Sequence, residues 1–102
     1  MKEYFVYILR CHDDSYYTGV TNDYRQRFSE HSHGLDPDSY THNRRPLQLV
    51  YVATFREITD AIAWEKKVKG WSRKKKEALI AREYERLPSL SVRHTPFKKK
   101  EA

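Results

Sequence analysis

The chain has 102 residues, 38% of them hydrophobic, which suits a single domain with a modest core. It carries 20 Lys and Arg against 14 Asp and Glu, a net charge of +6 that favours a polyanionic partner such as nucleic acid. A lone cysteine, Cys11, excludes an internal disulfide and a Cys-rich zinc site, and it favours a reducing, cytoplasmic location. No apolar run is long enough to span a membrane, and the first residues lack a signal-peptide pattern.

Two strands are predicted near the N-terminus. Residues 4–9, YFVYIL, are almost continuously apolar, as expected for a strand covered on both faces. The sequence CHDDS supplies turn chemistry, because Asp and Ser side chains bond to their own backbone. Residues 16–20, YYTGV, follow as a second strand, antiparallel to the first.

A first helix is predicted over residues 23–32, capped by Thr21 or Asn22, with Asp23 in its first turn. The spacing of Tyr24 and Phe28 places both on its core side. The stretch SHGLDPDSYTHNRRP then indicates a long loop, and loops of this length are often functional.

The second half of the chain is predicted to hold one strand and two helices. Residues 47–55, LQLVYVATF, are rich in β-branched and aromatic residues typical of a strand. Thr59 can cap a helix over 60–69 that ends at Gly70, and Ser72 can cap a third helix that stops before Pro88. The order β-β-α-β-α-α predicts an α+β fold with one small, mainly antiparallel sheet, formed by residues 1–87, and a basic, flexible tail over 88–102.

Glu65 occupies an unexpected position in the second helix. It lies in the middle of a stripe of apolar residues: Ile58, Ala61, Ile62 and Val68. A glutamate buried there without a partner would cost several kcal/mol. Glu65 is therefore paired, or binds a cation, or borders a cleft; the plainer alternative is a partly exposed glutamate in a salt bridge.

Arg27 and His31 flank the core-facing stripe of the first helix. The plainer interpretation places them at the border of that stripe, with the arginine stem covering apolar surface. If both helices pack on the same side of the sheet, these groups converge with the glutamate of the second helix. Tyr7 and Tyr17 could equally fill core positions, and Gly19 could be a packing point within its strand.

Together these residues resemble the GIY-YIG nuclease family. The pattern consists of Phe5-Val6-Tyr7, Tyr17-Thr18-Gly19, Arg27, His31 and Glu65, in the order of the family and close to its spacing. With the stretches THNRRPLQLVY and EKKVKGWSRKKKEALI, the chain looks most like the small stand-alone bacterial proteins of the UPF0213 group. The resemblance covers about residues 2–85.

This resemblance implies a three-stranded antiparallel sheet flanked by helices and an endonuclease that hydrolyses phosphodiester bonds in DNA, including branched, nicked or single-stranded forms. One divalent ion, Mg²⁺ or Mn²⁺, would be held by Glu65, because a hard cation can rely on one carboxylate with water and phosphate oxygens. Arg27 would bind the phosphate. Tyr7 and Tyr17 would orient or deprotonate the attacking water and hold the phosphate, and His31 would assist as acid, base or hydrogen-bond donor.

Gly19 would allow the backbone or the substrate to approach closely. The chain also departs from the family pattern: Phe5 and Val6 replace the Gly and Ile of the first motif, and Thr18 replaces the Ile of the second. The asparagine that many members carry after the glutamate is missing, and Glu77 lies near its position. The chain also has no room for the separate DNA-binding domain usual in these nucleases.

These departures leave open a binding module without turnover, or a nuclease that depends on an unidentified targeting partner. A zinc or redox protein built on Cys11 and the five histidines is a third possibility, but no pair of these residues has a recognised ligand spacing. Basic residues that could contact phosphates are Arg44, Arg45, Lys66, Lys67, Lys69, Arg73, Lys74, Lys75 and Lys76. Trp64 and Trp71 could stack on unpaired bases or pack in the core.

Overall fold

The computed structural model describes residues 2–82 and 93–94. Its strands are β1 (Tyr4–Arg10), β2 (Tyr16–Thr21), β3 (Gln48–Phe55) and β4 (Arg93–His94). Its helices are α1 (Tyr24–Ser32), α2 (Ile58–Lys69) and α3 (Arg73–Ile80), with a short 3-10 helix η1 (His42–Arg44). The sheet order is β2-β1-β3-β4, and every neighbouring pair is antiparallel.

The predicted α+β fold is confirmed. Its three antiparallel strands match the predicted ranges to within one residue, because runs of aromatic and β-branched residues bounded by turn residues are a local signal. The two-residue strand β4, which lies in the predicted tail, was not anticipated; the rest of that tail falls outside the described residues. No helix in the described part of the chain is long and apolar enough to cross a membrane.

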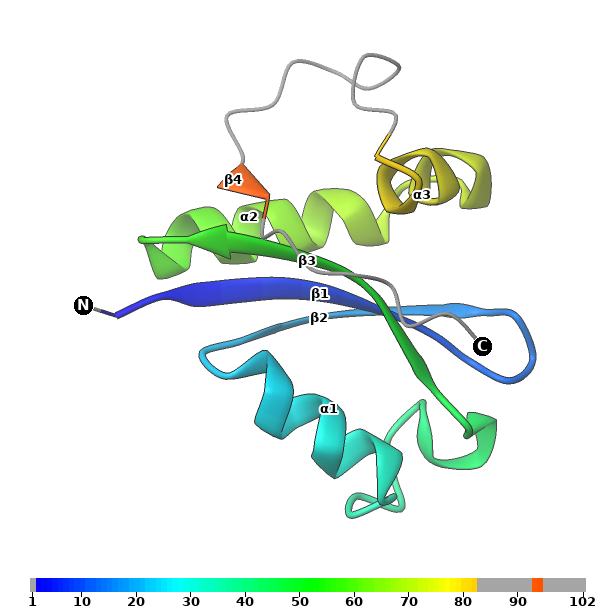
Figure 1. The fold of residues 1–102 in the computed structure, drawn as a ribbon. Helices are drawn as coiled ribbons and strands as arrows, with labels where there is room; N and C mark the ends of the chain where they lie inside the picture. Colours follow the sequence, from blue (N-terminus) through cyan, green and yellow to red (C-terminus); the bar gives the residue numbers. More distant parts are fainter. Residues whose placement is uncertain (1, 83–92, 95–102) are drawn as a thin grey trace.

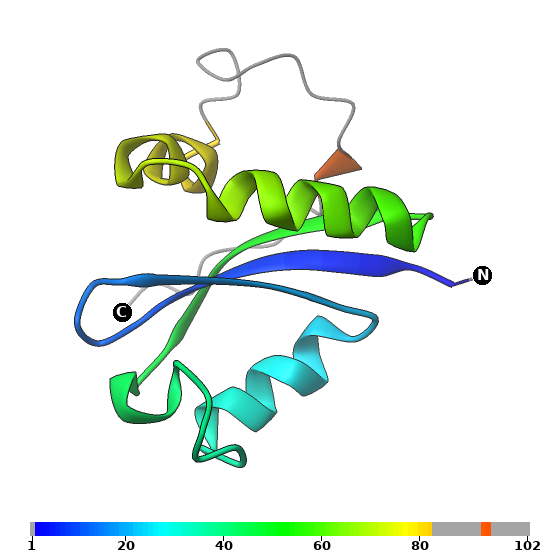
Figure 2. The same cartoon turned by 180° about the vertical axis from the view of Figure 1, so that it is seen from behind.

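The helices cover opposite faces of the sheet: α1 lies against one face, and α2 and α3 lie against the other (Figures 1 and 2). Alternate residues of β1 point to opposite faces of the sheet. Val6 and Ile8 pack with α2 and α3, whereas Tyr7 and Leu9 belong to the cluster that α1 covers. Helices α1 and α2 therefore do not share one side of the sheet. The predicted convergence of their polar groups depended on that condition, which is not met.

The buried face of α2 differs from the predicted stripe. Its buried residues are Ala61, Trp64 and Val68, whereas Ile58 and Ile62 are 40% and 37% exposed. The sheet accepts the bulkiest apolar side chain of the helix, and Trp64 Nε1 donates a hydrogen bond of 3.2 Å to the Tyr51 hydroxyl. Trp64 is thus a core residue, as its plainer interpretation stated.

Two predicted helix caps were wrong. Asp23, whose backbone is extended, caps α1 by accepting from the backbone N–H of Gln26, and neither Thr21 nor Asn22 does so. Helix α2 begins at Ile58 rather than after Thr59, with no side-chain capping bond. The predicted cap of the third helix is confirmed, because the Ser72 side chain accepts from the backbone N–H of Lys75. The predicted end of the second helix at Gly70 is confirmed as well.

The third helix is shorter than predicted. It ends at Ile80, where Ala81 N–H bonds to Glu77 O and Arg82 N–H closes a tighter turn onto Leu79 O. Arg82 has a φ of 64°, which cannot continue a right-handed helix. The predicted extension to the residue before Pro88 is therefore wrong at residues 81 and 82, and its remainder falls outside the described residues.

Candidate active site

Three aromatic side chains meet on the face that α1 covers. The register pairs Tyr7 with Gly19 and Leu9 with Tyr17, so both tyrosines point to that face from neighbouring strands. The Tyr7 hydroxyl lies 3.0 Å from His31 Nε2, and the ring centroids of Tyr17 and His31 are 5.3 Å apart. The chain thus brings together Tyr7, Tyr17 and His31, three of the residues predicted from sequence.

Gly19 makes room for the Tyr7 ring. A Cβ at position 19 would lie 2.5 Å from the Tyr7 hydroxyl oxygen and 2.6 Å from its Cζ, well inside van der Waals contact. Tyr7 is only 2% exposed, so its ring has nowhere to retreat. The close contact at this glycine is therefore with the Tyr7 side chain of the neighbouring strand, as the packing-point interpretation stated, and not with backbone or substrate.

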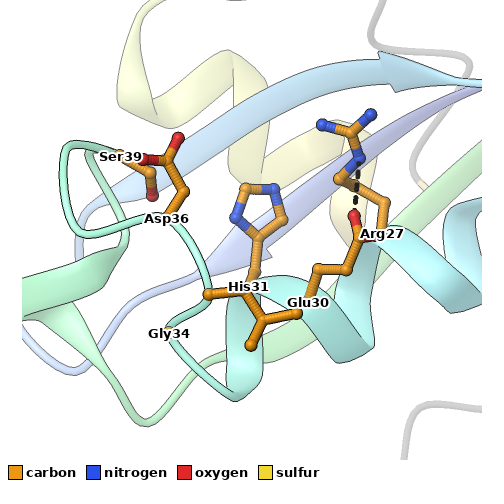
Figure 3. Close-up of a pocket in the computed structure, with 7 residues that line it drawn as sticks. Arg27, Glu30, His31, Gly34, Asp36 and Ser39 are labelled. Atoms are coloured by element: carbon orange, nitrogen blue, oxygen red, sulfur yellow. Dashed lines mark ion pairs between the residues drawn. The ribbon is translucent and has the colours of Figure 1, made fainter.

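His31 is held from its other side by the long loop, whose Ser39 and Asp36 lie near it in Figure 3. Its Nδ1 lies 2.9 Å from the Thr41 hydroxyl, which in turn lies 2.7 Å from the hydroxyl of Ser39. Thr41 is completely buried. Sequence reasoning missed Thr41 and Ser39, because no spacing signal shows which loop residues fold back onto the helix.

Burial decides which of these groups carries a proton. It raises the pKa of Tyr7 well above its usual value, and the nearby Tyr17 adds to this effect. Burial, together with the positive charge of Arg27, lowers the pKa of His31 below its usual value, so the imidazole is neutral at neutral pH. Tyr7 in this state is a hydrogen-bonding hydroxyl that keeps its proton rather than a ready base.

The Thr41 hydroxyl should fix the orientation and tautomer of His31. Thr41→Val keeps the shape of the side chain but leaves His31 Nδ1 without its partner, which should destabilise the fold by about 1–3 kcal/mol. Urea unfolding measures this loss, and the ¹⁵N shifts of the imidazole should change as the tautomer loses its fixed partner.

Thr18→Val is the matched control for that substitution. Thr18 is 2% exposed, and its hydroxyl has no hydrogen-bond partner among the described residues. Removing that hydroxyl should leave stability unchanged or slightly higher. Equal stability losses in Thr41→Val and Thr18→Val, with unchanged imidazole shifts, would show that Thr41 does not position His31.

Arg27 extends from α1 into the pocket shown in Figure 3, beside His31. Its side chain is 50% exposed, and its Nε lies 3.4 Å from Glu30 Oε1. An exposed pair of this kind contributes little to stability. The guanidinium is therefore accessible to an incoming anion and weakly held by its own partner.

Glu65 comes from the opposite face of the sheet. Its side chain is 14% exposed, and its Oε1 lies 3.4 Å from Lys69 Nζ, the salt bridge that the plainer interpretation described. Lys69 also lines a pocket with Tyr17 and Thr18 at β2, which is an edge strand. The two groups of candidate residues thus approach each other around the β2 edge, not on one face.

A divalent metal would fit Glu65 only in an open coordination mode. In the described residues no group of three or more His, Cys, Asp or Glu side chains could hold a metal ion. Glu65 offers carboxylate oxygens with some exposure and one cationic partner, Lys69. This suits a hard cation that keeps several waters and completes its shell with substrate phosphate oxygens.

The predicted phosphate-binding residues fall into two groups. All three arginines of the set are engaged within the chain: Arg44 pairs with Asp13 at 3.1 Å, Arg45 donates to His42 O, and Arg73 donates to Asp14 O. Most of the lysines lie exposed at the end of α2 and the start of α3: Lys66, Lys67, Lys69, Lys74 and Lys75. Trp71, half-buried, packs against Trp64 with ring centroids 5.4 Å apart.

The sequence-family model described as the GIY-YIG catalytic domain matches residues 3–78 of this chain. The chain therefore belongs to the GIY-YIG family. Its relatives include the UPF0213 protein BH0048 of Halalkalibacterium halodurans, 41% identical over 92 residues that cover 87% of this chain and 97% of that protein. The UPF0213 protein lmo0166 of Listeria monocytogenes is 42% identical over 85 residues, covering 82% and 93% respectively.

A solved structure supports the same assignment. The solution NMR structure of the UPF0213 protein BH0048 from Bacillus halodurans matches with a TM-score of 0.52 and 42% identity, covering 78% of this chain and 83% of that one. The resemblance inferred from the motif residues and the expected sheet flanked by helices are both confirmed.

Proposed function

We propose that this protein is a divalent-metal-dependent endonuclease that hydrolyses phosphodiester bonds in DNA. One observation carries the proposal: the hydrogen bond of 3.0 Å between the Tyr7 hydroxyl and His31 Nε2, beside Tyr17 and the accessible Arg27. A packing role alone does not require a neutral histidine bonded to a buried tyrosine and lining a pocket with an arginine. Membership of the GIY-YIG family supports a nuclease function in general terms.

The chain's own residues supply positioning and charge. Arg27 binds the scissile phosphate, because its fork of donors matches the oxygens on which negative charge grows. Tyr7 keeps its proton and acts as a hydrogen-bond donor, with His31 fixing the direction of its hydroxyl. Tyr17, at the β2 edge between the two groups of residues, is then the tyrosine placed to orient the attacking water.

Glu65 would hold Mg²⁺ or Mn²⁺ at the same edge, with Lys69 giving up its ion pair to make the carboxylate available. When bound, such an ion stabilises developing negative charge and lowers the pKa of a coordinated water. The exposed lysines at the end of α2 and the start of α3 would follow the DNA backbone without reading its sequence.

The rival is a DNA-binding module without turnover, favoured by the ion pairs that now occupy both Arg27 and Glu65. The test is a cleavage assay on labelled duplex, single-stranded, nicked, flap and four-way-junction DNA, with Mg²⁺, Mn²⁺ or a chelator. We expect product with either metal, none with the chelator, and a preference for one form of DNA. Binding without product under every metal would contradict the nuclease proposal and leave the binding module.

A further inference from the structure

A second pocket lies at the outer edge of the sheet, apart from the pocket of Figure 3. We call it the β2-edge pocket; it is lined by Tyr16, Tyr17, Thr18, Tyr40, Lys69 and Lys76. Three of these residues are consecutive on β2, one comes from the long loop, and the two lysines come from α2 and α3. Three aromatic rings and two ammonium groups therefore surround one hollow beside the candidate active site.

The positive charge of Lys76 is destabilised by its surroundings in this pocket. Lys76 is half-buried, and burial together with the charge of Lys69 lowers the pKa of its ammonium group. Lys69 has one close carboxylate partner, Glu65, at 3.4 Å. Two like charges that share a partly desolvated hollow favour the binding of an anion, since an anion would relieve their repulsion.

The aromatic side of the pocket includes one exposed ring, that of Tyr40. Tyr40 is 44% exposed although the Arg44 guanidinium lies 3.8 Å from its ring centroid. The Tyr17 ring lies nearly parallel to the Tyr40 ring, at an angle of 22° and a centroid distance of 6.1 Å. An exposed tyrosine beside lysines suits an unpaired nucleotide, whose base stacks on the ring while its phosphate meets the cations.

A buried hydroxyl without a partner in the described part of the chain lies in the wall of the same pocket. Thr18 is 2% exposed and lines the pocket, and its Oγ has no hydrogen-bond partner among the described residues. Buried hydroxyls are nearly always bonded, so the Thr18 hydroxyl is, within the residues that the structure describes, an unusual unbonded polar group in the wall of this pocket. A duplex cannot provide the stacked base, because its bases already stack on each other.

We infer that the β2-edge pocket binds an unpaired nucleotide of a DNA strand, with Lys69 and Lys76 on its phosphate and Tyr40 against its base. The inference rests on the proposed function and sharpens it, because it makes DNA with a single-stranded segment the preferred substrate. Tyr17 belongs to both sites, so the bound nucleotide would lie next to the bond to be cut.

The test measures binding without cleavage. Fluorescence anisotropy in a chelating buffer compares a labelled oligothymidine, the same oligonucleotide with an abasic position, and a duplex of equal length. We expect the full chain to bind the oligothymidine more tightly than either of the others. Lys76→Met should weaken that binding by about tenfold, as the loss of one charged hydrogen bond predicts. Tyr40→Leu should weaken it comparably, and should abolish the difference from the abasic strand.

Lys2→Met removes the same charge from an exposed residue outside the pocket and should change binding far less. Lys76→Arg, which keeps the charge, should restore most of the affinity, and thermal unfolding shows whether each variant folds. Equal weakening by Lys76→Met and Lys2→Met, or equal affinity for duplex and single strand, would overturn the inference. Because no metal is present, this result does not depend on cleavage: a wild type that binds as expected but never cuts would refute only the nuclease proposal.

Discussion

Gly19→Ala should destabilise the protein by about 3 kcal/mol, near the upper end of typical overpacking costs. The new methyl group would sit 2.5 Å from the Tyr7 hydroxyl oxygen, so the ring must move or the strands must part. A fully buried ring in a close-packed core has no free volume to take up. In a domain of this size the loss corresponds to a fall in Tm of roughly 15 °C, measurable by thermal unfolding. Displacing the Tyr7 hydroxyl also breaks its bond to His31, so cleavage should fall in the folded fraction as well.

Gly70→Ala is the matched control for this substitution. A Cβ there would lie 3.6 Å from Lys67 O and 3.8 Å from Lys66 O, which are ordinary contacts. Its φ of −81° suits any residue, so the stability change should stay below about 1 kcal/mol. A Gly19→Ala protein with the Tm of the wild type would show that β2 and Tyr7 are not in the tight contact described.

Local signals in the sequence were enough to predict the strands and the order of elements. The strand over residues 47–55 could be placed because its composition and flanking turns require no knowledge of the rest of the fold. The phase of α2 could not be fixed in this way. Periodicity grouped Ile58 and Ile62 with Ala61 and Val68, and only packing on the sheet buries Trp64 in place of the two isoleucines.

The candidate site was predictable where motif residues occupy adjacent strands, as Tyr7 and Gly19 do. It was not predictable where a loop returns to a helix, as Thr41 does to reach His31, because such a contact depends on the tertiary path of the loop. The relation of Glu65 to the other residues was also beyond the sequence. Periodicity assigns a residue to one side of its own helix, but it does not say which face of the sheet that helix covers.

Glu65→Gln should abolish metal-dependent cleavage while leaving the fold intact. The amide keeps the volume of the side chain but removes the carboxylate proposed to hold the cation, so the rate should fall at least about a thousandfold. The stability cost is small, because the lost pair with Lys69 is an i,i+4 pair worth about 0.3–0.5 kcal/mol. Glu57→Gln makes the same chemical change at the exposed N-terminal end of α2 and should leave cleavage unchanged.

The most direct test is therefore one incision time course, with wild type, Glu65→Gln and Glu57→Gln purified identically and given Mg²⁺ or a chelator. The substrate is the form of DNA that the wild type cuts best. The account predicts product from the wild type and Glu57→Gln with Mg²⁺, and none from Glu65→Gln or from any protein in the chelator. Product from Glu65→Gln at the rate of the wild type would contradict the proposal that this chain is a nuclease that acts through Glu65.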